Sequence, residues 1–172
     1  MKKIAILFLC LGLFISSFAQ QSDENITASK ILDEYVQYNR SKMFISYVYV
    51  SKAMMKVVDT KDLLSQINGI NGSSLIDKLS SIQIVGVELS HKNSLQGTMM
   101  TLVQKSGFER LLRLQNNYST TELFFHKKEV KKDNEVVPAE LLLLYDDPKS
   151  CKVIVFSGNF TLDDVVKAMK KR

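Results

Sequence analysis

Cysteine, histidine and long hydrophobic runs are scarce in this sequence, and each shortage excludes a class of protein. The 172 residues contain two cysteines and two histidines, too few for a thiolate zinc site or a fold held by several disulfides. The longest apolar run covers residues 4–15, well short of the roughly 20 residues that a helix needs to cross a bilayer. The formal net charge is only +5, so nucleic acid is not an expected partner. Stability must therefore come from an ordinary hydrophobic core.

The first residues have the pattern of a secretory signal peptide. Two lysines precede the apolar run, and Ser17 and Ala19 supply the small side chains that signal peptidase requires. We expect cleavage after Ala19, so that residues 1–19 are a leader and the protein is exported to the periplasm or beyond the cell. Cys10 lies inside the apolar run and leaves with the leader, so no lipid attachment is expected there.

The remaining chain has room for one domain. We expect residues 20–30 to form a flexible mature N-terminus and residues 31–172 to form a single domain. Loss of Lys2 and Lys3 lowers the net charge from +5 to +3. Cys151 is then the only cysteine, so it has no intramolecular disulfide partner.

The first half of the mature chain alternates between helical and strand patterns. Helical spacing of apolar residues and runs of β-branched and aromatic residues distinguish the two. Ser51 and Ser74 mark the starts of two shorter helices, and Gly107 is typical of a helix C-terminus. The first strand is apolar on both faces, so we expect it to be buried. The longer helices are predicted over residues 27–40 and 94–106, and the strands over residues 43–50 and 81–89.

The second half has a run of consecutive strands and ends in a helix that starts near Thr161. Strands joined by short turns pair antiparallel. Helices clustered early and strands clustered late predict an α+β fold. We expect a two-layer sandwich, with a mixed or mainly antiparallel sheet and helices packed on one face. The four strands are predicted over residues 108–114, 121–130, 138–145 and 151–158.

Two Asp pairs are predicted to be structural. Thr161 and Asp164 have the spacing of a capping box, in which each side chain binds the backbone N–H of the other residue. Asp163 favours the positive end of the same helix dipole. Asp146 and Asp147 precede a proline and indicate a turn. A shared metal site is disfavoured, because the two pairs would lie at opposite ends of one strand.

Paired methionines are the main candidate for a binding surface. Met54, Met55, Met99 and Met100 fall on predicted helices, and methionine side chains can fill gaps in a core or line an adaptable apolar groove. Neighbours on a helix point about 100° apart, so both members of a pair face the core only if the apolar stripe is wide. The groove and the core therefore stay alternatives.

The sequence contains no recognisable set of residues that could act together as a catalytic site. Cys151 could act as a nucleophile only with a nearby base, and His91 and His126 are the only histidines. Neither a glycine-rich phosphate loop nor a nucleophile elbow is present. We expect no cofactor and no metal.

Three segments carry a resemblance to a known family. They are "YVYVSKAMMKVV", "IDKLSSIQIVGVE" and "ELLLLYDDPKSCKVIVFSGNFTLDDVVKAM". Through them the chain resembles a family of small exported bacterial proteins known only as a domain of unknown function. The resemblance implies an exported bacterial α+β domain, and it transfers no catalytic motif.

These observations favour a non-catalytic exported domain that binds an envelope protein or a small apolar ligand. The alternative is a small hydrolase or transferase that uses Cys151 or His91. The two hypotheses differ in whether polar side chains converge in a pocket.

The leader gives the first testable prediction. Exported material should begin at Gln20 and stay in solution without detergent, because cleavage removes the longest apolar run. Intact-mass measurement reads the cleavage position directly. A mass that retains residues 1–19, or a lipid adduct on Cys10, would show that this interpretation of the leader is wrong.

Overall fold

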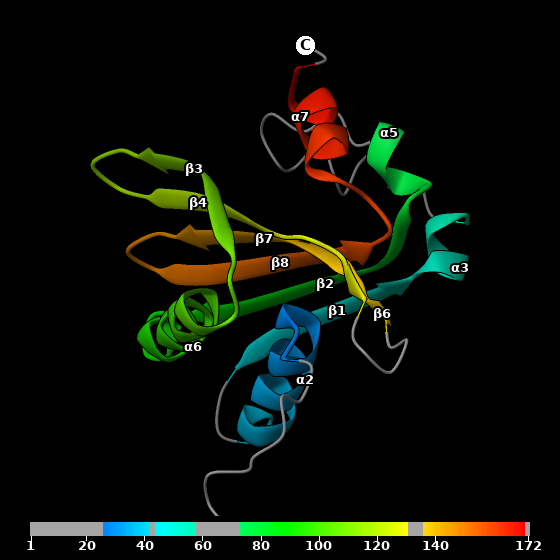
Figure 1. The fold of residues 1–172 in the computed structure, drawn as a ribbon. Helices are drawn as coiled ribbons and strands as arrows, with labels where there is room; N and C mark the ends of the chain where they lie inside the picture. The colour runs from blue at the N-terminus through cyan, green and yellow to red at the C-terminus, as the bar shows by residue number, and fades with distance from the viewer. Residues whose placement is uncertain (1–25, 42–43, 58–72, 131–135, 171–172) are drawn as a thin grey trace, which may run out of the picture.

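A six-stranded antiparallel sheet forms the centre of the molecule (Figure 1). The computed structural model describes residues 26–41, 44–57, 73–130 and 136–170, so the predicted leader over residues 1–19 lies outside the described residues. The strand order is β1-β2-β8-β7-β4-β3, and two further short strands, β5 and β6, pair with each other. The strands are β1 (Ile45–Ser51), β2 (Leu79–Glu88), β3 (Glu109–Gln115), β4 (Thr120–His126), β5 (Glu129–Val130), β6 (Val136–Val137), β7 (Ala139–Asp146) and β8 (Ser150–Gly158).

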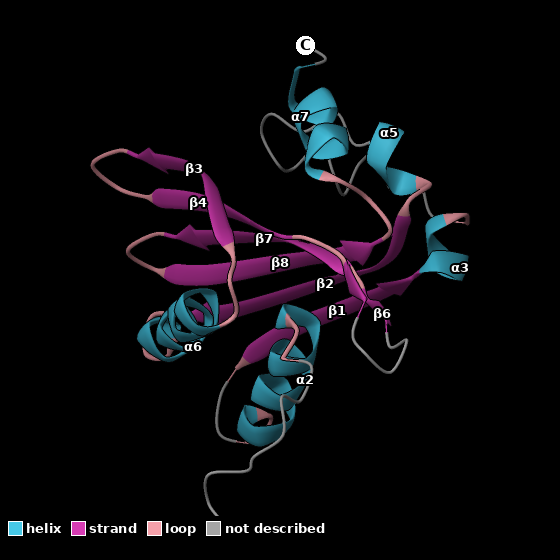
Figure 2. Cartoon of the chain, in the orientation of Figure 1, coloured by secondary structure: helices cyan, strands magenta, loops and turns pink. Residues whose placement is uncertain are grey.

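Helices lie on both sides of this sheet, as Figure 2 shows. Helices α2 and α6 share a hydrophobic cluster with one face, whereas α3, α5 and α7 share a second cluster with the other face. No helix among the described residues is long and apolar enough to span a membrane. The helices are α2 (Ala28–Asn39), α3 (Lys52–Met55), α5 (Ser73–Ile76), α6 (Lys92–Lys105) and α7 (Leu162–Lys170).

The leucine-rich strand β7 explains why both faces are covered. Leu142 and Leu144 pack into the cluster with α2 and α6, while Leu141 and Leu143 pack into the cluster with α7. A strand that is apolar on both faces needs cover on both. The predicted α+β class and the mainly antiparallel sheet are confirmed. The expectation that helices pack on one face is corrected, since they cover both.

Local sequence signals place the ends of the last two long helices. Gly107 has φ +68°, the left-handed conformation that ends α6 and that favours glycine. At the start of α7, the Thr161 N–H donates to Oδ2 of Asp164 at 2.9 Å, and the Asp164 N–H donates to Oγ1 of Thr161 at 3.3 Å. The predicted capping box is therefore present. Lys78 Nζ lies 2.7 Å from Oδ1 of Asp164, and this cation lowers the pKa of Asp164 to about 2.

Three boundaries differ from the expected ones. Helix α2 begins at Ala28, inside the stretch of residues 20–30 assigned to a flexible terminus, and Ala28 is fully buried. Helix α3 has only four residues, and β4 ends at His126 rather than at Val130. Residues 20–25 of that stretch lie outside the described residues.

Replacing each of two glycines with alanine should change the free energy of unfolding in opposite directions. At Gly158 an added Cβ would meet backbone atoms of β2, including Cα of Leu79 at 2.8 Å, so Gly158→Ala should lower the free energy of unfolding by about 1–3 kcal/mol. At Gly97, within α6, the space is open, so Gly97→Ala should raise it by about 0.5–1 kcal/mol. Urea denaturation measures both. A neutral Gly158→Ala would contradict the close approach of β2 and β8.

Candidate functional site: the open edge of strand β1

Strand β1 is an edge of the main sheet and pairs, among the described strands, with β2 alone. The predicted burial of the strand over residues 43–50 is therefore wrong. Val48 and Tyr49 expose 47% and 54% of their surface, and within β1 only Val50 is buried. Aromatic and β-branched residues favour a strand, but they do not determine its place in the sheet order.

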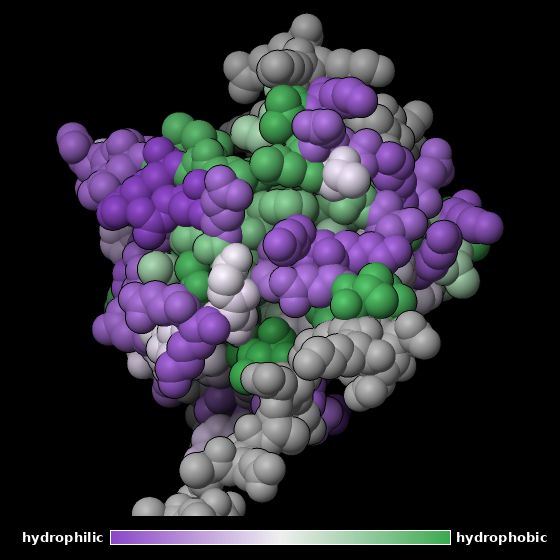
Figure 3. All heavy atoms as spheres, in the orientation of Figure 1, coloured by the Kyte–Doolittle hydropathy of each residue, from purple (hydrophilic) through white to green (hydrophobic). Residues whose placement is uncertain are grey.

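The two edges of the sheet differ in how they are protected. Edge strands commonly carry charges or a bulge, which hinder pairing with another chain. Strand β3 has both, with Arg110, Arg113 and a register shift after Arg110. Hydrophilic residues cover the end of the sheet that holds β3 and β4 in Figure 3. By contrast, β1 contains no charged residue and pairs with β2 without a register shift.

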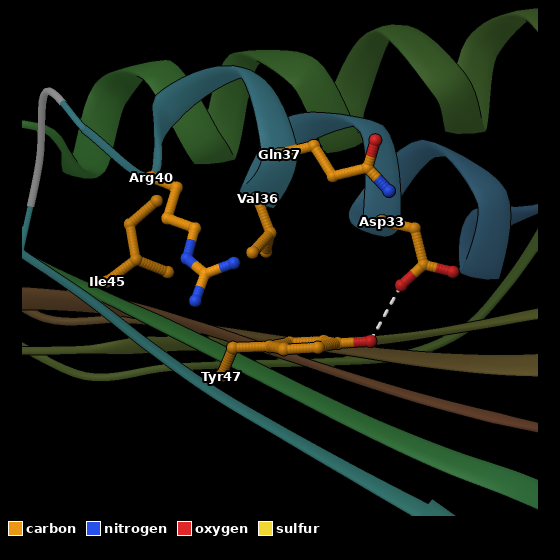
Figure 4. A pocket seen from close by; sticks show the side chains of 6 residues that line it. All are labelled: Asp33, Val36, Gln37, Arg40, Ile45 and Tyr47. Atoms are coloured by element: carbon orange, nitrogen blue, oxygen red, sulfur yellow. Dashed lines mark hydrogen bonds between the residues drawn. The ribbon is translucent and has the colours of Figure 1, made fainter.

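Two clefts flank the first half of β1, one on each face of the sheet. The first has a volume of about 400 Å³ and lies between α2 and β1 (Figure 4). The second has a volume of about 600 Å³ and is lined in part by Ser46, Gly86 and Lys152, which lie opposite one another on β1, β2 and β8. A Cβ at Gly86 would lie 2.6 Å from Oγ of Ser46, so the bare backbone of Gly86 leaves room in this cleft.

A buried carboxylate positions α2, which is one wall of the first cleft. Glu140 is 1% exposed on β7 and accepts hydrogen bonds from the N–H groups of Ala28 and Ser29 at 2.6 and 3.0 Å. Ser157 Oγ lies 3.2 Å from Oε1 of Glu140 as a third donor. Burial raises the pKa of Glu140, and these donors oppose the rise. The first amides of a helix carry partial positive charge, so they suit a carboxylate.

Polar contacts continue from α2 to the edge of the sheet. Ser29 Oγ donates to Oε1 of the buried Gln83 at 2.8 Å, and Nε2 of Gln83 donates to Oδ1 of Asp33 at 3.0 Å. The Tyr47 hydroxyl on β1 donates to the same oxygen of Asp33 at 2.6 Å. Burial and the contact with Asp33 raise the pKa of Tyr47 to about 12, so its proton stays in place at neutral pH. This polar chain joins β7, α2, β2 and β1.

The structure does not bring the four methionines of the predicted groove together. Met55 is buried with the cluster on the α7 face, and its neighbour Met54 is exposed. Met99 is fully buried with the cluster on the α2 face, and Met100 packs against that cluster at its margin. One member of each pair is thus core, and the pairs lie on opposite faces. The four methionines therefore do not line one shared groove, and a binding role for any one of them stays a prediction.

The catalytic candidates are likewise apart. Cys151 is fully buried, and burial raises the pKa of its thiol to about 12, which disfavours the thiolate that a nucleophile requires. His91 is the residue before α6, and its side chain makes no capping hydrogen bond. His126, at the end of β4, packs against the ring of Phe108 with the ring centroids 5.1 Å apart and the ring planes tilted by 41°. Within the described part of the chain, neither imidazole forms a hydrogen bond with Cys151.

The acidic pairs occupy opposite ends of β8. Asp147 accepts hydrogen bonds from the N–H groups of Lys149 and Ser150 at 2.7 and 2.8 Å, which build the turn before β8 and lower the pKa of Asp147. Asp146 forms an ion pair with Lys92 at 3.2 Å. No group of three His, Cys, Asp or Glu side chains within the described ranges is arranged to hold a metal ion.

Sequence reasoning missed the residues that build this edge. A glutamate inside the apolar strand "PAELLLLY" was a usable signal, because a charge at such a position requires a buried partner. Gln83 gave a similar signal inside "SIQIVGVEL". No local pattern marked Arg40 or Tyr47, because the first cleft forms only when α2 packs against β1.

These features define a class of protein: an α+β domain whose sheet has one guarded edge, the charged and interrupted strand β3, and one open edge, the uncharged strand β1. Two clefts flank the open edge. The chain belongs to the family described as domain of unknown function DUF4252, which matches residues 38–168. No curated protein and no solved structure matches the chain.

Glu140 gives a pH-dependent prediction. Its pKa is raised in the folded protein, so the folded state holds the proton more tightly than the unfolded state. The contribution of Glu140 to stability is then fully present below its ordinary pKa of 4.5 and is lost as the pH rises through the higher folded value. Glu140→Gln should remove this loss.

Urea unfolding of both proteins at pH 4.5 and pH 8 tests this. Other titrating groups are common to the two proteins, so the difference between their pH dependences isolates Glu140. Equal pH dependence in the wild type and Glu140→Gln would contradict a raised pKa.

Proposed function

We propose that this domain is a non-catalytic binding module that accepts an extended segment of another protein as a seventh strand beside β1. The observation that carries the proposal is the contrast between the two edges of one sheet: β3 is charged and interrupted, whereas β1 is regular and uncharged. An added strand gains affinity from main-chain hydrogen bonds and specificity from pockets that take alternate side chains. The two clefts lie on the two faces where those side chains would point.

Charge around β1 favours a partner segment that is neutral or acidic. Four exposed cations surround the strand: Arg40 before it, Lys52 and Lys56 after it, and Lys152 across the second cleft. Glu88 is an exposed acid on the second cleft, and Asp33 is engaged in the polar chain. Complementary charge steers association and suppresses wrong partners.

The place of action follows from the leader in the same proposal. Residues 1–19 carry the domain out of the cytoplasm, so the partner is a protein of the cell envelope. The catalytic alternative has less support, because Cys151 is buried and neither Cys151 nor His91 lines either of the two clefts.

A selection from random heptapeptides displayed on phage tests strand addition, because seven residues match the length of β1. The mature chain is the target, and the strongest peptide is made synthetically. Binding should slow hydrogen exchange of amides in β1, while amides of β3, the guarded edge, serve as the internal control and keep their rates.

Methylation of the peptide amides gives a second, sharper readout. In a strand only alternate N–H groups point at the neighbouring strand. Methylating the three amides that point at β1 should weaken binding about a hundredfold, since each hydrogen bond contributes about 1 kcal/mol. Methylating the alternate amides, which point away from β1, should have little effect. Equal losses in both phases, protection outside β1, or no selected peptide would overturn the proposal.

A further inference from the structure

The cleft between α2 and β1 has an acidic end and a basic end. Asp33 and Arg40 both come from the α2 side of the cleft, seven residues and therefore about 10 Å apart along the helix axis. Val36 lies between them, and Ile45 and Tyr47 of β1 form the opposite wall. Figure 4 shows the guanidinium of Arg40 extending from the end of α2 toward β1, at the opposite end of the cleft from Asp33.

The two ends differ in whether their charges are already used. The carboxylate of Asp33 accepts hydrogen bonds from the Tyr47 hydroxyl at 2.6 Å and from Nε2 of Gln83 at 3.0 Å. Arg40 is exposed and forms no hydrogen bond or ion pair with the part of the chain that the structure describes. A guanidinium stays charged at all physiological pH values and offers paired N–H donors that match a carboxylate.

The strand proposed for the open edge would bring side chains to this cleft. Residues directly opposite each other on paired strands point to the same face of a sheet. Ile45 and Tyr47 face the α2 side, so the residues of an added strand that lie opposite them would face that side too. One such side chain would enter beside Arg40, with its stem against the apolar wall of Val36 and Ile45.

We infer that this cleft selects the partner segment by an acidic side chain, aspartate or glutamate, whose carboxylate binds Arg40. The inference rests on the proposed function, since the added strand carries the carboxylate. The acid at the other end of the cleft is engaged by Tyr47 and Gln83, so it leaves the basic end to receive the ligand. The cleft then favours an acidic residue over its amide.

The test uses the selected heptapeptide, remade with Glu, Gln or Lys at each position that faces α2. At one position the Glu peptide should bind at least about fivefold more tightly than the Gln peptide, as expected for hydrogen bonds to a charged group. Arg40→Gln should abolish this preference, and Arg40→Lys should retain part of it. Lys167→Gln, which removes an exposed cation of α7 on the opposite face of the sheet, should leave the preference intact.

The outcomes separate this inference from the proposal on which it rests. Peptides that protect β1 but bind equally well with Glu and Gln, or that keep their preference in Arg40→Gln, would overturn the acidic selection and leave strand addition standing. Failure of every peptide to protect β1 would overturn strand addition itself. Glutarate that competes fully with the peptide at an equal concentration would show that the cleft binds free carboxylates, which would also overturn selection of a strand-borne acid.

Discussion

The hydrogen bonds between Glu140 and the start of α2 are the contact on which the open edge depends. A carboxylate buried in a sheet costs several kcal/mol unless donors replace its water. Two amides of α2 and the hydroxyl of Ser157 supply them, and in return the helix is held at one position above β7. The chain of contacts from Ser29 through Gln83 to Asp33 then carries this position outward to Tyr47 on β1. Contacts with Glu140 on the central strand β7 thus determine the position of α2, which forms one wall of the first cleft.

Helices cover both faces of the sheet, so another chain can pair with the sheet only at its edges. Central strands such as β7 and β8 are apolar on both sides, so helices are needed on both. On β1 the helices cover little, and four consecutive residues, Ser46 to Tyr49, are exposed. An uncharged, regular edge of this kind is a hazard in solution unless a partner occupies it. The proposed strand addition would turn this hazard into a function, and Arg40 would add selectivity that backbone pairing alone lacks.

The chemistry of the described residues supports recognition more than catalysis. Polar side chains with shifted pKa values are present, but each shift has a structural cause: burial raises the pKa of Cys151, Glu140 and Tyr47, and the contact with Asp33 adds to the rise for Tyr47. Perturbed groups at an active site usually converge on a cavity where a reacting atom could lie. Here they hold elements of the fold together. Arg40, an exposed cation beside the first cleft, suits binding of an anion rather than proton transfer.

The sequence alone determined the features that depend on neighbouring residues. The capping box of α7, the left-handed stop at Gly107 and the strand character of β7 and β8 were readable because their causes lie within a few positions. The order of the strands, the exposure of β1 and the first cleft were not readable. Ala28 and Glu140 are 112 residues apart, and Gln83 and Asp33 are 50 apart, so no local pattern encodes their meeting. Only the tertiary structure decided these features, because they arise from the packing of surfaces that distant segments present to one another.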